Sequence, residues 1–394
     1  MLTRRGRLAL ALGGLTYVVA WAFGSRALYP VAVGLLVAAA GAWLWVAIGA
    51  RPVRLERRAR GGRHYEGDDV VVDLRLDVDG VVPSPPTRVV EVVPRLGERS
   101  TDLEGRGRFR WARYTLHALP RGRYTVDDAR AVVEDPFGLA SRSYPLAVDG
   151  SLLVYPRHVE VDRLFSERGL REPGGRKLLL HRAAGYDLHH VREYAQGESL
   201  RRVHWPTTAR RSRLMVKELQ DAPRDEVAVI LDADGAAQTQ ETFDLSVRVA
   251  ASIVRSHARQ GRRTVLLVTG RRQEALQIAS GESDWDAALD VLAAAAPDGH
   301  RPLTTVLADE TGAASRALEL ALVTASLTPA LADRIVQRML THRRVSLVFV
   351  DRRARAEPEP QLLRVQAAGV PLAVARPGDD LAAALGAWVE AANA

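Results

Sequence analysis

Two long stretches without charge in the first fifty residues constrain the fold more than any other feature of the chain. The first runs from Leu8 to Ser25 and the second from Ala27 to Ala50, with only Arg26 between them. At a rise of about 1.5 Å per residue, a helix of either length can cross a hydrocarbon core of about 30 Å. Because the connection around Arg26 is so short, the two helices must run antiparallel. The sequence therefore predicts a two-helix transmembrane hairpin over residues 1–52.

Arginines flank both ends of this predicted hairpin, whereas its tip carries one. They are Arg4, Arg5 and Arg7 before the first helix, and Arg51, Arg54, Arg57, Arg58 and Arg60 after the second. Basic loops stay in the cytoplasm, so the pattern predicts a multi-pass protein of the bacterial plasma membrane with the bulk of its chain cytoplasmic. The net charge of +8 suits contact with anionic lipid. A secretory signal peptide is the alternative, and the second apolar segment with its basic flank favours the hairpin.

The sequence has no cysteine, which excludes disulfides, thiolate zinc sites and cysteine nucleophiles within these residues. It also has no Walker loop, no Gly-x-Gly-x-x-Gly after a strand and no Gly-x-Ser-x-Gly elbow. These absences predict a protein that is not an enzyme and that needs no cofactor.

Residues 53–160 change to the short period of β-strands. Residues 70–78 alternate apolar and charged side chains, as a strand with one buried face does. Further short runs, separated by turn residues, occupy positions 89–93, 109–116, 124–126, 131–133 and 152–155. Strands at this spacing predict an antiparallel β-sandwich, with a Greek-key barrel as the alternative.

Residues 223–394 alternate short apolar runs with amphipathic stretches. The runs, which fit strands covered on both faces, are 227–231, 264–268, 320–323, 345–350 and 371–374. An amphipathic helix is expected over 242–260 with His257 on its buried side, and Ser283 and Thr328 are placed to cap two further helices. The alternation predicts a doubly wound α/β domain with a parallel sheet.

Residues 161–222 connect these parts and hold the most distinctive motif of the chain. Its members are Gly185, Arg192-Glu193-Tyr194, Gly197-Glu198, Arg201, His204-Trp205 and Ala209-Arg210. This segment resembles the signature of the bacterial domain-of-unknown-function family 58. Asp135-Pro136-Phe137-Gly138-Leu139 and Tyr155-Pro156 are similar to further landmarks of that family, and the order of parts is similar too. The resemblance implies that the C-terminal domain is von Willebrand factor A-like.

The function implied by the resemblance is interaction rather than catalysis, because the family has no assigned reaction. Its members look like membrane-bound interaction proteins that are often encoded beside MoxR-type AAA+ ATPases. The resemblance therefore implies a membrane-anchored adaptor that binds a protein partner, such as a MoxR-type ATPase.

The end of the first strand of the α/β domain offers two carboxylates, Asp232 and Asp234. Ligands of open sheets lie beyond the carboxyl ends of the strands, and a hard cation needs several oxygen ligands there. A metal-ion-dependent adhesion site would need Asp-x-Ser-x-Ser, but Ala236 supplies no ligand atom, and Thr324 and Ser326 follow a later strand without the expected aspartate. We therefore expect both carboxylates to be strand-end or cap acceptors. The alternative is a divalent-metal-dependent adhesion module or enzyme that uses Asp232 and Asp234.

The signature segment permits three interpretations. A zinc site could draw on His189, His190, Glu193 and His204, but the His-Glu-x-x-His spacing is absent. A nucleic-acid surface could draw on Arg182, Arg192, Arg201, Arg202, Arg210, Arg211, Arg213 and Lys217, with Tyr194 and Trp205 between them. Interleaved carboxylates argue against it, because they would pair with the same arginines. The favoured interpretation is a docking or interdomain packing segment, with Trp205 buried and with Arg192 and Arg201 paired to carboxylates.

Overall fold

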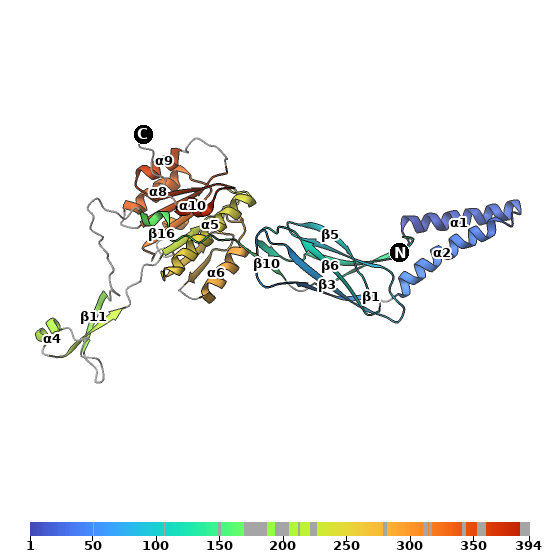
Figure 1. Ribbon diagram of the computed structural model, residues 1–394, viewed down its shortest axis with the longest axis horizontal. Helices are drawn as coiled ribbons and strands as arrows, with labels where there is room; N and C mark the ends of the chain where they lie inside the picture. Colours follow the sequence, from blue (N-terminus) through green and yellow to red (C-terminus); the bar gives the residue numbers. More distant parts are fainter. Residues whose placement is uncertain are drawn as a thin grey trace. The chain divides into compact units, whose positions relative to one another are not determined.

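A computed structural model gives the fold of the protein as two compact units, Met1–Tyr155 and Pro156–Ala394 (Figure 1). The residues it describes are 1–49, 51–105, 107–148, 151–168, 187–193, 205–211, 213–220, 227–278, 282–309, 314, 317–340, 344–352 and 360–386. The finer division expected at residues 52, 160 and 222 stays a prediction.

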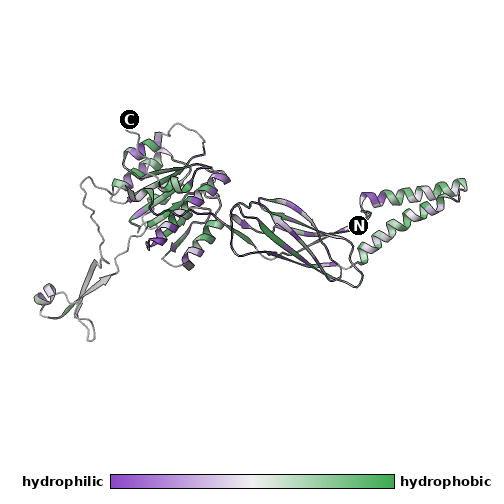
Figure 2. Cartoon of the chain, viewed as in Figure 1, coloured by the Kyte–Doolittle hydropathy of each residue, from purple (hydrophilic) through white to green (hydrophobic). Residues whose placement is uncertain are grey.

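The first unit opens with two helices, α1 (Arg4–Phe23) and α2 (Leu28–Ile48), which pack against each other as a hairpin. The Thr3 hydroxyl caps α1 by accepting from the Gly6 amide at 3.1 Å, and Gly24 ends it in the left-handed conformation. Both helices are long and apolar enough to cross a membrane by length and composition, although a signal sequence would pass the same test. Most residues of both helices are hydrophobic, as Figure 2 shows. Many of their large apolar side chains are exposed.

Strands β1 to β10 complete the first unit. Their bounds are Arg51–Ala59, His64–Tyr65, Val70–Asp79, Thr87–Val93, Gly97–Asp102, Phe109–Leu116, Gly122–Tyr124, Asp128–Glu134, Ser141–Pro145 and Leu152–Tyr155. They form sheets in the orders β1-β3-β6, β5-β4-β8-β9 and β2-β10-β7, in which every pairing is antiparallel except that of β2 with β10. The run expected at 124–126 starts where β7 ends.

One hydrophobic core lies between the sheets of the first unit. The even-numbered residues of β3 from Val70 to Val78 are at most 3% exposed, while their neighbours point outward. They pack with residues of β4, β6, β8 and β10, so the sheets bury their apolar faces against one another. The alternation seen in the sequence at 70–78 is therefore the alternation of a half-buried strand.

The second unit is built on a six-stranded sheet. Its strands are β13 (Val227–Leu231), β14 (Thr264–Val268), β15 (Glu274–Ile278), β16 (Glu319–Thr324), β17 (Arg344–Val350) and β18 (Leu372–Ala375). They lie in the order β15-β14-β13-β16-β17-β18, and all neighbours are parallel except β14 and β15. The five buried runs expected from the sequence are confirmed as the five parallel strands.

Helices cover this sheet. They are α5 (Gln240–Arg259), α6 (Glu282–Ala294), α7 (Leu303–Ala308), α8 (Pro329–Leu340), α9 (Pro360–Ala367) and α10 (Leu381–Gly386). The apolar sides of α7, α8 and α9 share one core with residues of β13, β14, β16 and β17. The capping prediction is confirmed for Thr328, whose hydroxyl accepts from the Leu331 amide at 3.3 Å. It is wrong for Ser283, because α6 already begins at Glu282.

Four described elements lie in residues 161–222, which were expected only as a connecting segment. They are α3 (Phe165–Arg168), β11 (Asp187–Glu193), α4 (Trp205–Arg211) and β12 (Met215–Gln220). β11 and β12 pair antiparallel, with an irregularity in register between Leu188 and His190. The segment predicted as a connection therefore contains a β-hairpin with a helix between its strands.

Candidate functional site

From β13 the chain continues to β14 on one side of the sheet, and it later returns to β16 on the other side of β13. The position between β13 and β16 is therefore a topological switch point. Open α/β sheets bind ligands at such a switch point, beyond the carboxyl ends of the strands. Three polar side chains meet at this edge: Asp232 after β13, Thr269 after β14 and Thr324 at the end of β16. The strand ends bring together residues that lie far apart in the sequence.

Asp232 is the centre of this cluster and is only 3% exposed. Its Oδ2 accepts a hydrogen bond from the Thr324 hydroxyl at 2.6 Å, and its Oδ1 accepts from the Asp234 amide at 3.2 Å. The Thr269 hydroxyl lies 3.5 Å from the same Oδ1. Burial raises the pKa of the Asp232 carboxyl, and the hydrogen bond from Thr324 partly opposes that shift. The carboxylate is thus held by donors from two neighbouring strands.

Asp234 is partly exposed and closes a turn. Its Oδ1 accepts from the Ala236 amide at 3.0 Å, and its backbone forms an isolated parallel bridge with Gly299. A side chain at Gly299 would meet the Thr269 carbonyl oxygen at 2.2 Å. Only glycine fits this approach, so the loop that follows α6 is fixed directly against the site.

Gln238 is a member of this site that the sequence did not single out. It is buried, its Nε2 donates to the Asp232 carbonyl at 2.6 Å, and its Oε1 accepts from the Ser246 hydroxyl at 3.3 Å. The only sequence signal was its position between the strand-end carboxylates and the Thr239 cap of α5. Gln238 ties the first turns of α5 to the end of β13.

The oxygen atoms at this edge are of the kind that hard cations prefer. Within the described residues, however, no three His, Asp or Glu side chains come together in a way that could hold a metal ion. Both carboxylates instead accept hydrogen bonds from protein groups, as strand-end and turn acceptors do. The edge of the sheet is therefore a preorganised polar surface with a buried carboxylate beneath it.

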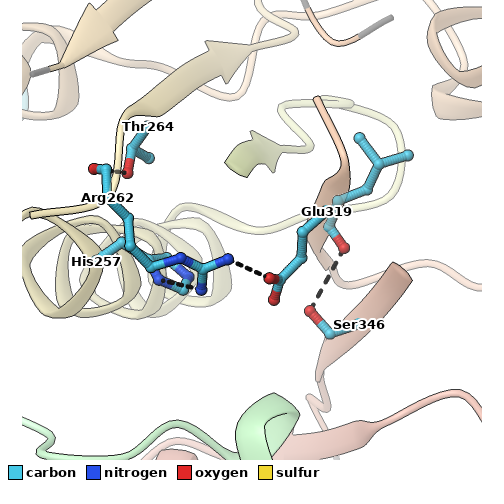
Figure 3. Close-up of polar contacts among 6 residues, drawn as sticks. His257, Arg262, Thr264, Glu319 and Ser346 are labelled. Carbon is cyan, nitrogen blue, oxygen red and sulfur yellow. Dashed lines mark hydrogen bonds and ion pairs between the residues drawn. The ribbon is translucent and has the colours of Figure 1, made fainter. Parts of the chain in front are cut away.

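A second polar network lies at the opposite edge of the sheet, where β14 and β16 begin (Figure 3). The Arg262 guanidinium donates from Nη2 to Glu319 Oε2 at 2.5 Å and from Nη1 to His257 Nδ1 at 3.1 Å. His257 is fully buried on α5, as its place on the apolar side of that helix predicted. Burial, with the nearby Arg262 charge, lowers the pKa of His257 to about 3. The network joins α5 to the sheet and keeps the imidazole neutral.

The signature residues are described only in part. Arg192 and Glu193 lie in β11, opposite Val216 and Met215 of β12, and Arg210 lies exposed in α4. Tyr194, Gly197, Glu198, Arg201 and His204 lie outside the described residues. The expectation that Trp205 is buried is wrong, because 65% of its surface is exposed at the start of α4.

The first unit also contains a cavity of about 340 Å³ that was not predicted from the sequence. It lies beside the end of β1 and the strand β10, and its lining includes Arg57, Arg63 and His64. The Arg57 side chain is almost fully buried, 3.8 Å from Glu91. Arginines scattered through a β-rich stretch give no signal that one of them turns inward.

Comparison with known proteins finds one family model that matches part of the C-terminal half of the chain. Residues 190–370 match the family described as "Protein of unknown function DUF58". The protein YeaD of Bacillus subtilis (strain 168), itself described as uncharacterized, is 27% identical over 216 residues, which are 55% of this chain and 53% of YeaD. The chain thus spans about half the length of this curated relative. These matches agree with the family resemblance predicted from the signature.

Similarity to solved structures is slight. The CARDB domain of the PF1109 protein of Pyrococcus furiosus is 11% identical, with 25% of this chain and 90% of that one covered, at a TM-score of 0.16. The alkylpurine DNA glycosylase AlkC of Pseudomonas fluorescens is 13% identical, with 33% and 42% covered, also at a TM-score of 0.16. TM-scores this low carry no argument about fold or function.

Proposed function

We propose that the protein is a membrane-anchored adaptor whose second unit binds a protein partner, with a MoxR-type AAA+ ATPase as the proposed partner. The observation that carries the proposal is the exposed Trp205 at the start of α4, with Arg210 exposed on the same helix. Tryptophan and arginine are the residues on which the binding energy of protein interfaces concentrates. A large aromatic side chain left in solvent within a family signature is suited to a partner's pocket.

The proposed topology places both ends of the α1–α2 hairpin, and both units, on the cytoplasmic side of the plasma membrane. The exposed apolar surface of both helices supports their insertion, because lipid would cover it. The arginines before α1 and after α2 support the orientation. A cytosolic ATPase could then reach the second unit.

The proposed von Willebrand A-like character of the second unit is supported by its parallel sheet and by the polar cluster at the switch point. Such domains usually bind partners, so this fold suits an adaptor. No catalytic step is proposed for the chain.

Replacing Trp205 by alanine tests the partner surface. The loss of one interface hot spot costs at least about 2 kcal/mol, so the variant should bind the partner about 30-fold more weakly than the native chain. The measurement is recovery of the MoxR-type ATPase with the tagged protein after mild detergent extraction of native membranes. Trp111→Ala is the matched control, because Trp111 is 55% exposed in β6 of the other unit and should not affect recovery. Equal recovery with both variants, or a native chain without any specific partner, would contradict the proposal.

The second candidate function is a divalent-metal-dependent adhesion module or enzyme. It is favoured by one observation, the convergence of Asp232, Thr269 and Thr324 at the switch point. Calorimetry of the full chain in detergent with Mg²⁺ and Mn²⁺ separates the candidates. We expect no saturable heat, because Asp232 is occupied by protein donors and Ala236 supplies no ligand. Saturable heat that is lost in Asp232→Asn would establish the metal site instead.

A further inference from the structure

The strands β1 to β10 of the first unit together form its β-module. Both ends of the α1–α2 hairpin contact the same end of this β-module. At the start of α1, the Thr3 amide donates to the Leu139 carbonyl at 2.9 Å and the Thr3 hydroxyl donates to the Gly138 carbonyl at 2.6 Å. A side chain at Gly6 would meet the Leu139 carbonyl oxygen at 2.1 Å, so the first turn of α1 lies directly on this loop. The chain start is thereby held in place by residues 138–141.

The end of α2 is held in the same region. The Trp45 indole donates from Nε1 to the Pro83 carbonyl at 2.9 Å, and a side chain at Gly49 would meet Pro85 at 2.9 Å. Ala42 and Val46 of α2 pack in a small apolar cluster with Leu2, Leu139 and Ala140. The loop that precedes β4 and the loop between β8 and β9 therefore border the base of the hairpin.

The loop between β8 and β9 is built to expose an apolar side chain. Asp135 is buried and accepts from the Ala140 amide at 2.5 Å and from the Phe137 amide at 2.9 Å, while Gly138 adopts a positive φ of 68°. This rigid turn leaves Phe137 74% exposed. An Asx-type turn with a left-handed glycine fixes the chain direction, so the exposure of the phenyl ring is set by the backbone.

The second loop at the base presents another apolar tip. Val81 follows Gly80 after β3 and is fully exposed. The register of β1 with β3, in which Arg51 lies opposite Asp79, places Val81 at the end of the β-module where α2 enters it. Exposed arginines surround the same base; they are Arg4, Arg5, Arg7, Arg51 and Arg54. Two apolar tips and a group of cations thus share one end of the unit.

From this juxtaposition we infer that the loops carrying Phe137 and Val81 dip into the headgroup layer of an anionic membrane beside the base of the hairpin. The inference rests on the proposed membrane insertion of α1 and α2, because insertion brings their charged ends to the headgroup level. At that depth a phenyl ring and a valine side chain leave water, and the arginines lie beside lipid phosphates. The partner that fits the surface is an anionic phospholipid layer.

The consequence is a fixed orientation of the β-module relative to the membrane. Two loops that contact lipid beside the base of the hairpin resist tilting of the first unit against the membrane. The two loops that border the base of the hairpin therefore serve as additional membrane contacts.

Site-directed spin labelling tests the inference directly, because the native chain contains no cysteine. Phe137→Cys and Val81→Cys place a nitroxide on each tip, where both native side chains are exposed and their loss leaves the core intact. The full chain is reconstituted in vesicles of phosphatidylcholine with and without phosphatidylglycerol. The readout is collision of the label with oxygen, which enters lipid, and with a water-soluble nickel chelate.

Two matched labels serve as references. Gly62→Cys is exposed beyond the far end of β1, with open space around its Cβ, and reports water. Gly41→Cys is exposed in the second half of α2, also in open space, and reports lipid if the hairpin is inserted. We expect labels at 137 and 81 to lose several-fold in nickel collisions relative to the label at 62. We also expect a deeper position when phosphatidylglycerol is present.

The outcomes separate the inference from the proposed function. A lipid signal at 41 with a water signal at 137 and 81 would overturn the inference and leave the anchor standing. A water signal at 41 would overturn both. Equal immersion with and without phosphatidylglycerol would overturn the part assigned to the arginines.

Discussion

Replacing Glu91 by alanine is expected to lower the thermal unfolding midpoint of the Met1–Tyr155 unit by about 10 °C. Glu91 and Arg57 are side chains 2% and 5% exposed in the core of this unit. Arginine keeps its charge in proteins, so the variant would leave a buried cation without a counterion. Breaking a buried pair in this way costs about 3–5 kcal/mol, and each kcal/mol shifts the midpoint of a unit of this size by about 2–4 °C.

The geometry explains why Glu91 matters more than the distance to its partner suggests. Tyr114 donates from its hydroxyl to Glu91 Oε2 at 2.8 Å, while Arg57 Nε lies 3.4 Å from the Tyr114 oxygen and 3.8 Å from Glu91 Oε1. Burial, with the nearby Glu91 charge, raises the pKa of the Tyr114 phenol to about 12, so the phenol stays a donor. Glu91 belongs to β4, whereas Arg57 and Tyr114 belong to the sheet of β1 and β6. The carboxylate is therefore the polar link between two sheets.

Two further variants control this prediction, with melting of the full chain in detergent followed by circular dichroism. Glu98→Ala removes an exposed carboxylate that pairs with Arg130 at 3.2 Å, and it should shift the midpoint by no more than about 4 °C. Arg57→Met combined with Glu91→Leu replaces both charges by apolar groups and should recover part of the loss, because the Tyr114 hydroxyl still lacks its acceptor. A Glu91→Ala protein that melts like Glu98→Ala would show that the pair is not an energetic link.

The sequence predicted those parts of the fold whose periodicity is set by burial. Residues 70–78 alternate because one face of β3 is buried, and the run 227–231 is apolar throughout because β13 is buried on both faces. It did not predict β15, an antiparallel edge strand whose residues are mostly exposed and include Glu274 and Gln277. An exposed edge needs no apolar pattern, so its sequence carries no signal.

The candidate site, like the fold, could be predicted from the sequence only in part. Asp232 could be placed in advance, because a carboxylate that follows the first parallel strand must lie at the carboxyl edge of the sheet. Its partners Thr269 and Thr324 come from neighbouring strands, and their contact with Asp232 depends on the strand order, which the sequence does not give. The expected burial of Trp205 was wrong, because an aromatic residue in a sequence can lie either in a core or on the surface.

Acid should destabilise the Pro156–Ala394 unit through His257. The pKa of His257 in the folded chain is about 3, below the ordinary value of 6.5 that applies when the chain is unfolded. Between these values the unfolded chain binds a proton that the folded chain does not, so stability rises with pH there and is lost as pH falls from 6.5 toward 3. Down to pH 4 the loss should amount to about 3 kcal/mol. The physical cause is burial of the imidazole and the Arg262 guanidinium, which donates to Nδ1 and repels a second cation.

The contribution of this one group is isolated by a pair of substitutions. In His257→Gln the side chain no longer titrates. The free energy of unfolding, measured from pH 7 to pH 4, should therefore fall by about 3 kcal/mol less in this variant than in the native chain. His300→Gln removes an exposed histidine of the same unit and should leave the native slope unchanged. Parallel slopes in the native and His257→Gln proteins would mean that His257 is protonated without cost. That result would contradict the geometry. His257 Nδ1 accepts a hydrogen bond from Arg262, which also donates to Glu319, so a protonated Nδ1 would lose this bond and lie beside a second cation.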